Sequence, residues 1–162
     1  IKDTTERAII KLTGKFTDTT QEANTVRIQA NTLYGAMNTT NQLLSGGGTA
    51  KSYYDLAVFR IWYDCACEGD VELFWNAATP EPLMIMNGNG EFDGMGNWTT
   101  IPNNAAGTSG CKGDIGIVTR GMAANDSYTM VIELRKDNAY YQRGQFNDPA
   151  AFNYGTDYKI RP

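Results

Sequence analysis

Cys65, Cys67 and Cys111 are the cysteines of the chain and its most distinctive chemical groups. A zinc site built on them would need a fourth ligand, such as Asp64 or Asp114. Structural zinc sites use C-x2-C pairs, and C-A-C with one distant cysteine is a weak match. We therefore predict free, mostly buried thiols, no metal site and no cofactor. A disulfide from Cys111 to one of the other two stays open as an alternative; it would require Cα atoms within about 7 Å.

The chain contains no histidine, the commonest general base and triad partner. Oxygen-bearing side chains alternate through N-G-N-G-E-F-D-G at 87–94. The segment departs from a calcium loop because Phe92 stands where the sharp turn needs glycine, so we expect a solvated loop. Acidic pairs such as Glu68 with Asp70 would suit a carboxylate hydrolase, but acids beside glycine are ordinary in turns. We predict that the protein is not an enzyme.

Alternation with period two marks the strands that must position any site. Between Cys111 and Lys136, two alternating runs flank a turn of Gly, Asn, Asp and Ser, which predicts a β-hairpin. A second predicted hairpin joins the apolar segment 53–67 to 71–75, with a turn at 68–70. Six residues on apolar strand faces are the predicted core: Trp62, Leu73, Ile117, Met130, Ile132 and Leu134.

Length and composition indicate one globular domain. The chain has 162 residues, of which 41% are hydrophobic and 20% charged, and its 17 glycines indicate many turns. We predict an all-β fold, an antiparallel two-sheet β sandwich, jelly-roll-like, with little helix. The single domain, 1–162, would carry an N-terminal arm at about 1–13 and an aromatic C-terminal tail at about 138–162. A net charge of -4 argues against nucleic acid as a partner, and no apolar run is long enough to span a membrane.

Aromatic side chains in the tail lie outside any alternating strand and need a surface that removes them from water. We predict that the terminal segments carry contacts between subunits, and the alternative is a tail that folds back over its own sandwich. The predicted interface residues are Ile9, Ile10, Tyr140, Tyr141, Phe146, Phe152, Tyr154 and Tyr158.

Short pieces distributed over most of the chain resemble virion structural proteins of marine tailed phages, especially cyanophages. These pieces are D-T-T-E-R-A-I-I-K-L-T-G-K-F-T at 3–17, W-N-A-A-T at 75–79, N-G-N-G-E-F-D at 87–93, I-P-N-N at 101–104, K-G-D-I-G-I-V-T at 112–119 and N-D-S-Y-T-M-V-I-E-L-R-K at 125–136. C-A-C at 65–67 is not a feature that we associate with these proteins.

The resemblance implies a bacteriophage virion protein, most simply a capsid decoration or cement protein that binds the outer head lattice through its termini. Its partners would be the major capsid protein or other virion proteins, in a homo-oligomer or bound to the lattice. It would be made in the bacterial cytoplasm and reside in the virion. One alternative is a neck, tail or fibre component with a carbohydrate-binding β sandwich, for which a glycan is the partner. A hydrolase that uses carboxylates is a more distant alternative.

Overall fold

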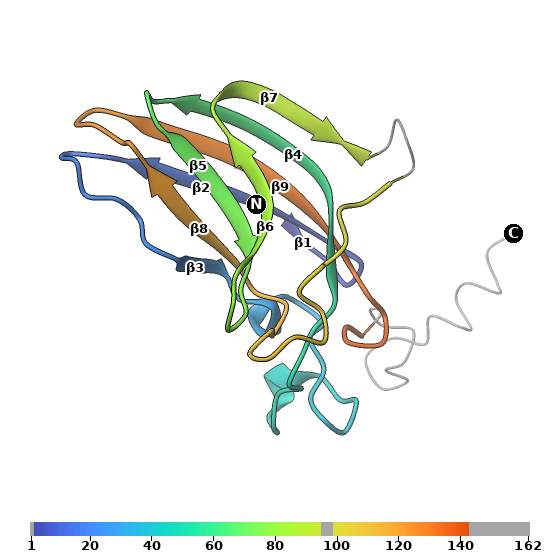
Figure 1. The fold of residues 1–162 in the computed structure, drawn as a ribbon. Coiled ribbons are helices and arrows are strands. Elements are labelled where there is room, and N and C mark those ends of the chain that lie inside the picture. Colours follow the sequence, from blue (N-terminus) through green and yellow to red (C-terminus); the bar gives the residue numbers. More distant parts are fainter. Residues whose placement is uncertain (1, 95–98, 143–162) are drawn as a thin grey trace, which may run out of the picture.

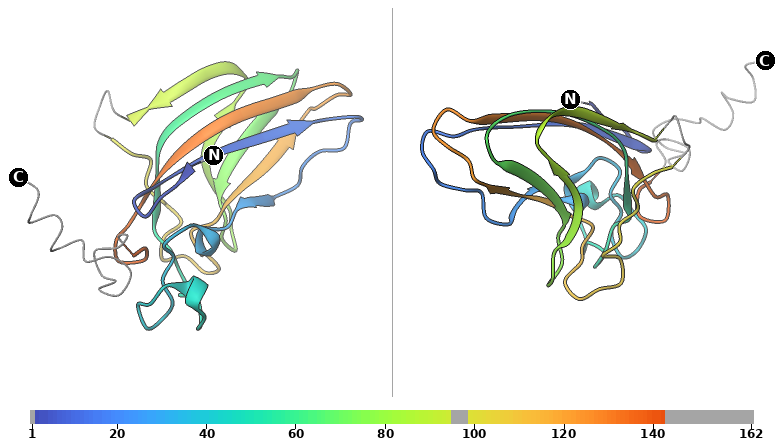
Figure 2. Two further views of the ribbon diagram at one scale, coloured as in Figure 1. Left: turned by 180° about the vertical axis from the view of Figure 1, so that it is seen from behind. Right: turned by 45° about the horizontal axis from the view of Figure 1, so that its top comes forward.

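Two antiparallel sheets pack face to face in the computed structural model, which describes residues 2–94 and 99–142 (Figures 1 and 2). Sheet A has the order β1-β2-β9-β4-β7 and sheet B the order β3-β8-β5-β6. Their bounds are β1 Lys2–Asp3, β2 Arg7–Lys15, β3 Thr25–Ile28, β4 Leu56–Ala66, β5 Asp70–Trp75, β6 Glu81–Met86, β7 Gly88–Asp93, β8 Ile115–Arg120 and β9 Ser127–Lys136. Two 3-10 turns, Ala30–Thr32 and Leu44–Gly46, lie in the loops at one end of the sandwich.

The strand pairs are nested. β2 pairs with β9, β3 with β8, β4 with β7 and β5 with β6, always antiparallel. The chain therefore forms one long antiparallel hairpin with its tip between β5 and β6, rolled so that alternate pairs fall in different sheets. This arrangement is a jelly roll. The prediction of an antiparallel, jelly-roll-like two-sheet sandwich is confirmed.

Both predicted hairpins are wrong, because the strands on either side of each turn belong to different sheets. β8 lies in sheet B and β9 in sheet A, while β4 lies in sheet A and β5 in sheet B. The turn between β8 and β9 does occur, and Gly121 and Asn125 adopt positive φ angles of 69° and 78° there. Alternation tells which residues share a face, but it does not tell which strand is the neighbour. The turns therefore carry the chain from one sheet to the other.

The core lies between the inner faces of the two sheets. On β9, Met130, Ile132 and Leu134 are fully buried, and Leu73 and Ile117 of sheet B are fully buried opposite them. Burying each such side chain is worth roughly 1.5–3 kcal/mol. Five of the six predicted core residues are thus confirmed.

Trp62 is the exception, because it lies on the outer face of sheet A with 38% of its surface exposed. A β-bulge in β4 explains the error. Val58 pairs with Leu134 while Arg60 pairs with Glu133, so β4 carries one extra residue, Phe59, at this point. An extra residue inverts the alternation beyond it, which turns Trp62 outward.

The segment 87–94 is largely a strand, so the expectation of a solvated loop is wrong. β7 pairs with β4 over six residues, from Arg60↔Asp93 to Cys65↔Gly88. Glycine is uncommon in strands and weakens them, so its presence in this segment argued against the strand that the structure shows. The Tyr63 side chain occupies the space beside Gly90, since a Cβ at Gly90 would lie 2.6 Å from the Tyr63 hydroxyl.

Candidate functional site

The structure describes four of the eight predicted interface residues. Ile9 and Ile10 lie in β2, both half-buried, so the predicted arm at 1–13 is β1 and most of β2. Tyr140 is half-buried and Tyr141 is fully buried in its own chain. The remaining four, Phe146, Phe152, Tyr154 and Tyr158, lie outside the described residues. That these eight residues contact another subunit stays a prediction.

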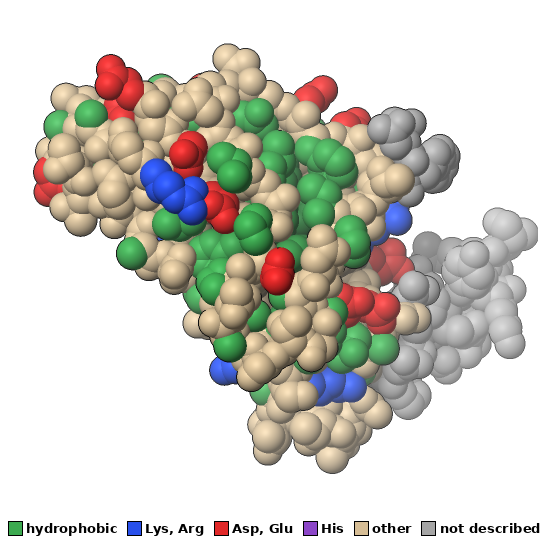
Figure 3. All heavy atoms as spheres, viewed as in Figure 1, with side chains coloured by type: hydrophobic (Ala, Val, Ile, Leu, Met, Phe, Trp, Pro, Cys, Tyr) green, Lys and Arg blue, Asp and Glu red, His purple; other side chains and the backbone are tan. Residues whose placement is uncertain are grey.

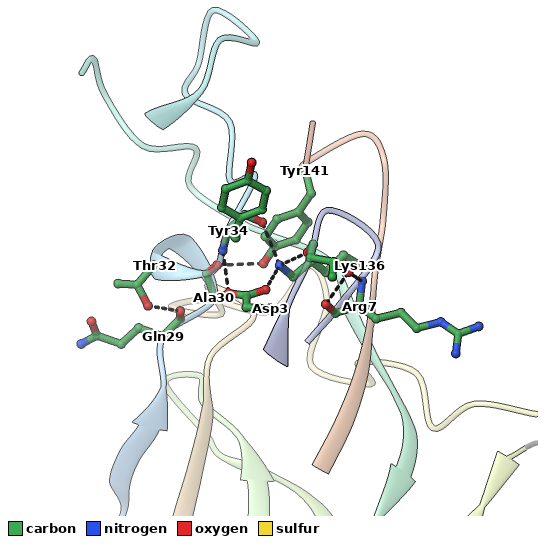
Figure 4. Close-up of polar contacts among 9 residues, drawn as sticks. Asp3, Arg7, Gln29, Ala30, Thr32, Tyr34, Lys136 and Tyr141 are labelled. Carbon is green, nitrogen blue, oxygen red and sulfur yellow. Dashed lines mark hydrogen bonds and ion pairs between the residues drawn. The ribbon is translucent and has the colours of Figure 1, made fainter. Parts of the chain in front are cut away.

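Lys136 joins the N-terminal segment to the last described residues of the chain (Figure 4). Its side chain is completely buried and forms an ion pair with Asp3. Its Nζ also donates to the backbone oxygens of Thr4, at 2.7 Å, and Tyr34, at 2.8 Å. It lies 5.1 Å from the centre of the Tyr141 ring. One ammonium group thus contacts three segments, at residues 3–4, 34 and 141, of which the first two are far from Lys136 in the sequence.

We call Lys136, Asp3, Thr4, Tyr34 and Tyr141 the Lys136 cluster. Its members compensate the buried charge of Lys136, which would otherwise be costly. Burial lowers the pKa of Lys136, and the hydrogen bond and charge of Asp3 oppose this shift. Asp3 is itself held in place, because its second carboxylate oxygen accepts a hydrogen bond of 2.7 Å from the Tyr34 backbone nitrogen. Removing one member of such a pair leaves the other charge without compensation. The cluster therefore fixes the position of β1.

Sequence reasoning missed this cluster although one signal pointed to it. Lys136 continues the inward-facing series Tyr128, Met130, Ile132 and Leu134 at the same spacing of two residues. A lysine at that position is predicted to be buried, and a buried lysine needs an acidic or carbonyl partner. The identity of the partner, Asp3, could not be read from the sequence, because 133 residues separate the two.

The residues just before the predicted tail are part of the sandwich. The Tyr141 hydroxyl donates to the Ala30 backbone oxygen at 2.8 Å, and its ring lies 5.6 Å from that of Tyr54. The backbone nitrogen of Gln142 donates to the Gly35 oxygen at 2.7 Å. Tyr140 packs edge-on against Tyr53 and lines a surface hollow of about 870 Å³. The described part of the chain therefore ends docked on the sandwich, with Tyr140 beside this hollow.

The outer face of sheet B is rich in hydrophobic side chains, which gather over its middle in Figure 3. Phe74 is buried there outside the core cluster, and the outer end of its ring covers Gly116 of the neighbouring strand, where a Cβ would lie 2.2 Å from Cζ. Ile85 on the same face is 61% exposed. Arg120 bridges Asp70 and Glu72 at the edge of this apolar region.

The three cysteines are free thiols in the structure. Cys65 and Cys111 are buried and Cys67 is half-buried. Burial raises the pKa of Cys65 to about 11, which makes it a poor nucleophile and a poor metal ligand at neutral pH. In the ranges 2–94 and 99–142, no three acidic, cysteine or histidine side chains come together as a metal site would require.

Comparisons with known proteins identify no relative. No family model matches the chain, and neither a curated protein nor a solved structure matches it. No helix in the described part of the chain has the length and apolar character needed to cross a bilayer.

Proposed function

We propose that this protein is a structural component of a tailed-phage virion, most simply a decoration or cement protein on the outer surface of the capsid. The resemblance of its sequence pieces to cyanophage virion proteins supports this role. Jelly rolls serve as capsid domains and as lectins, so the fold is compatible with it, although a fold alone does not define a function.

The observation that carries the proposal is the Lys136 cluster. It holds β1 and the start of the C-terminal segment together at one position on a rigid sandwich. Binding is stronger when the contacting parts are already in place, because less conformational freedom is lost on association. A particle protein that attaches through its terminal segments benefits from such an anchor. The neighbours would be the major capsid protein or further copies of this chain.

Placement in the particle tests the proposal. In a reconstruction of the intact virion, the protein is expected on the head lattice at a copy number that follows the capsid symmetry. Isolated protein added to heads that lack it should bind them and raise their resistance to heat. Location at the tail alone, or no binding to such heads, would contradict a decoration role.

A second candidate is a neck, tail or fibre component that binds carbohydrate. One observation favours it, the exposed indole of Trp62 surrounded by polar side chains on the outer face of sheet A. The same reconstruction separates the two candidates by position, whereas sugar binding alone does not, because a β sandwich at either position can carry a sugar site.

A further inference from the structure

A small group of side chains around Trp62 forms a defined surface on the outer face of sheet A. The register of β9, β4 and β7 places Val131, Trp62 and Glu91 in one row across the sheet, and Thr129, Asp64 and Asn89 in the next. These six residues, the Trp62 surface, line a shallow depression of about 440 Å³. Spacings within sheets give it a span of roughly 10 Å across the strands and 7 Å along them.

The indole of Trp62 is held in position before any ligand arrives. The Arg60 guanidinium lies over the ring at 4.9 Å from its centre. Arg60 is in turn fixed by its ion pair with Asp93, at 3.1 Å between Nε and Oδ1. A cation over one face of a tryptophan ring is an attractive contact. The ring therefore presents an oriented apolar surface at the edge of the depression.

The polar members of the Trp62 surface have unused hydrogen-bonding capacity. Among the described residues, the side chains of Asp64, Asn89, Glu91 and Thr129 have no hydrogen-bond or ion-pair partner. Elsewhere on sheet A the acidic side chains are paired, as Glu133 is with Arg7 at 2.9 Å. Two carboxylates, an amide and a hydroxyl therefore surround one aromatic ring and one valine, and all four polar groups are available to bind a ligand.

We propose that the Trp62 surface binds a neutral oligosaccharide. A pyranose ring has a C–H face that packs on an aromatic ring and hydroxyl groups at its edge that donate to carboxylate and amide oxygens. The two carboxylates disfavour sulfated or uronic sugars through repulsion of like charges. The depression is open at the surface and has room for one or two rings, so an internal stretch of a longer glycan fits as well as its end.

Binding of unmodified hexasaccharides to the full chain tests this proposal. The probes are cellohexaose, laminarihexaose, maltohexaose and chitohexaose, titrated by calorimetry and by tryptophan fluorescence. At least one is expected to bind. Trp62→Ala should weaken binding by about tenfold or more, and Trp62→Phe, which keeps a ring, by less. Glu91→Gln should weaken it by about three- to tenfold, because a bond to a charged acceptor becomes a bond to a neutral one.

The matched control is Tyr34→Ala, which removes another exposed ring that does not line the depression and should leave the affinity unchanged. Since Trp62 lies outside the core, its variants are expected to unfold within about 2 °C of the parent protein. An unchanged unfolding midpoint would show that a loss of binding is a local effect. The proposal is overturned if no hexasaccharide binds at millimolar concentration, or if Trp62→Ala binds as well as the parent. Equal affinity for a sulfated hexasaccharide would overturn the assignment to neutral sugars.

Discussion

Two isoleucines differ sharply in burial, so their alanine variants show how burial affects the free energy of unfolding. Ile132 is fully buried between the sheets, whereas Ile85 is 61% exposed on sheet B. We expect Ile132→Ala to lower the free energy of unfolding by about 2–5 kcal/mol, because it leaves a cavity in the core. Ile85→Ala should change it by less than about 0.5 kcal/mol. Urea denaturation of both variants measures the difference, and equal losses would mean that β9 faces the other way.

Tyrosine burial predicts a loss of stability at alkaline pH. Burial makes the largest contribution to raising the pKa of Tyr128 and of Tyr141 well above the ordinary value of 10.0. Below pH 10 these residues are protonated in both states and do not affect the pH dependence. Above pH 10 the unfolded chain loses the protons that the folded chain retains, so each tyrosine costs about 1.4 kcal/mol of stability per pH unit.

Tyr141→Phe isolates one of these contributions. The variant leaves the Ala30 carbonyl without its 2.8 Å hydrogen bond, which should cost about 1–3 kcal/mol at neutral pH. Above pH 10 its stability should fall less steeply than that of the parent, by about 1.4 kcal/mol per pH unit. Lys136, whose lowered pKa acts in the opposite direction, is present in both proteins and cancels in the comparison. Stability curves that stay parallel up to pH 11 would contradict the burial of this hydroxyl.

At the scale of single elements, the approach to β8 depends on a glycine. Gly113 has a φ of 90°, and a Cβ there would lie 1.9 Å from the backbone oxygen of Tyr54. Gly107 has a similar φ of 82° but open space around it. Both alanine variants bear the cost of a left-handed backbone, and only Gly113→Ala adds a steric clash. We expect it to be the more destabilising by about 2 kcal/mol or more in thermal or urea unfolding, and equal losses would count against this close approach.

The strands show what sequence patterns can and cannot predict. The alternation in β9 was sufficient to predict its buried face, because side-chain direction is a local property of extended chain. Strand partners were not predictable in the same way, since the jelly roll pairs β2 with β9 across most of the chain. The bulge in β4 lies at Phe59, whose ring is covered by Arg135 of β9 and Arg7 of β2, so it involves segments far apart in the sequence. That one residue decided whether Trp62 was assigned to the core or to the surface.

For the whole molecule, the sequence indicated the polar and aromatic residues of the termini but not how they are held. Tyr141 was predicted at an interface between subunits and lies inside its own sandwich. Rings in a segment without alternation carry no periodic signal, so their burial depends on loops such as 29–37 that the sequence does not place. The Trp62 surface was missed for a related reason, because it is assembled from three strands.

Two truncations of the C-terminus distinguish residues needed for folding from residues needed for attachment to a particle. Removing residues 138–162 deletes Tyr141 and its contacts with Ala30 and Tyr54, so we expect a loss of several kcal/mol or failure to fold. Removing only 143–162 keeps every described contact in the Lys136 cluster, so we expect this variant to fold with a cooperative unfolding transition. If the terminal segment attaches the protein to a particle, this shorter truncation should remain folded and no longer bind heads that lack the protein. Full binding by the folded 1–142 chain would move the attachment surface to the sandwich, where the apolar outer face of sheet B is the first place to introduce charged substitutions.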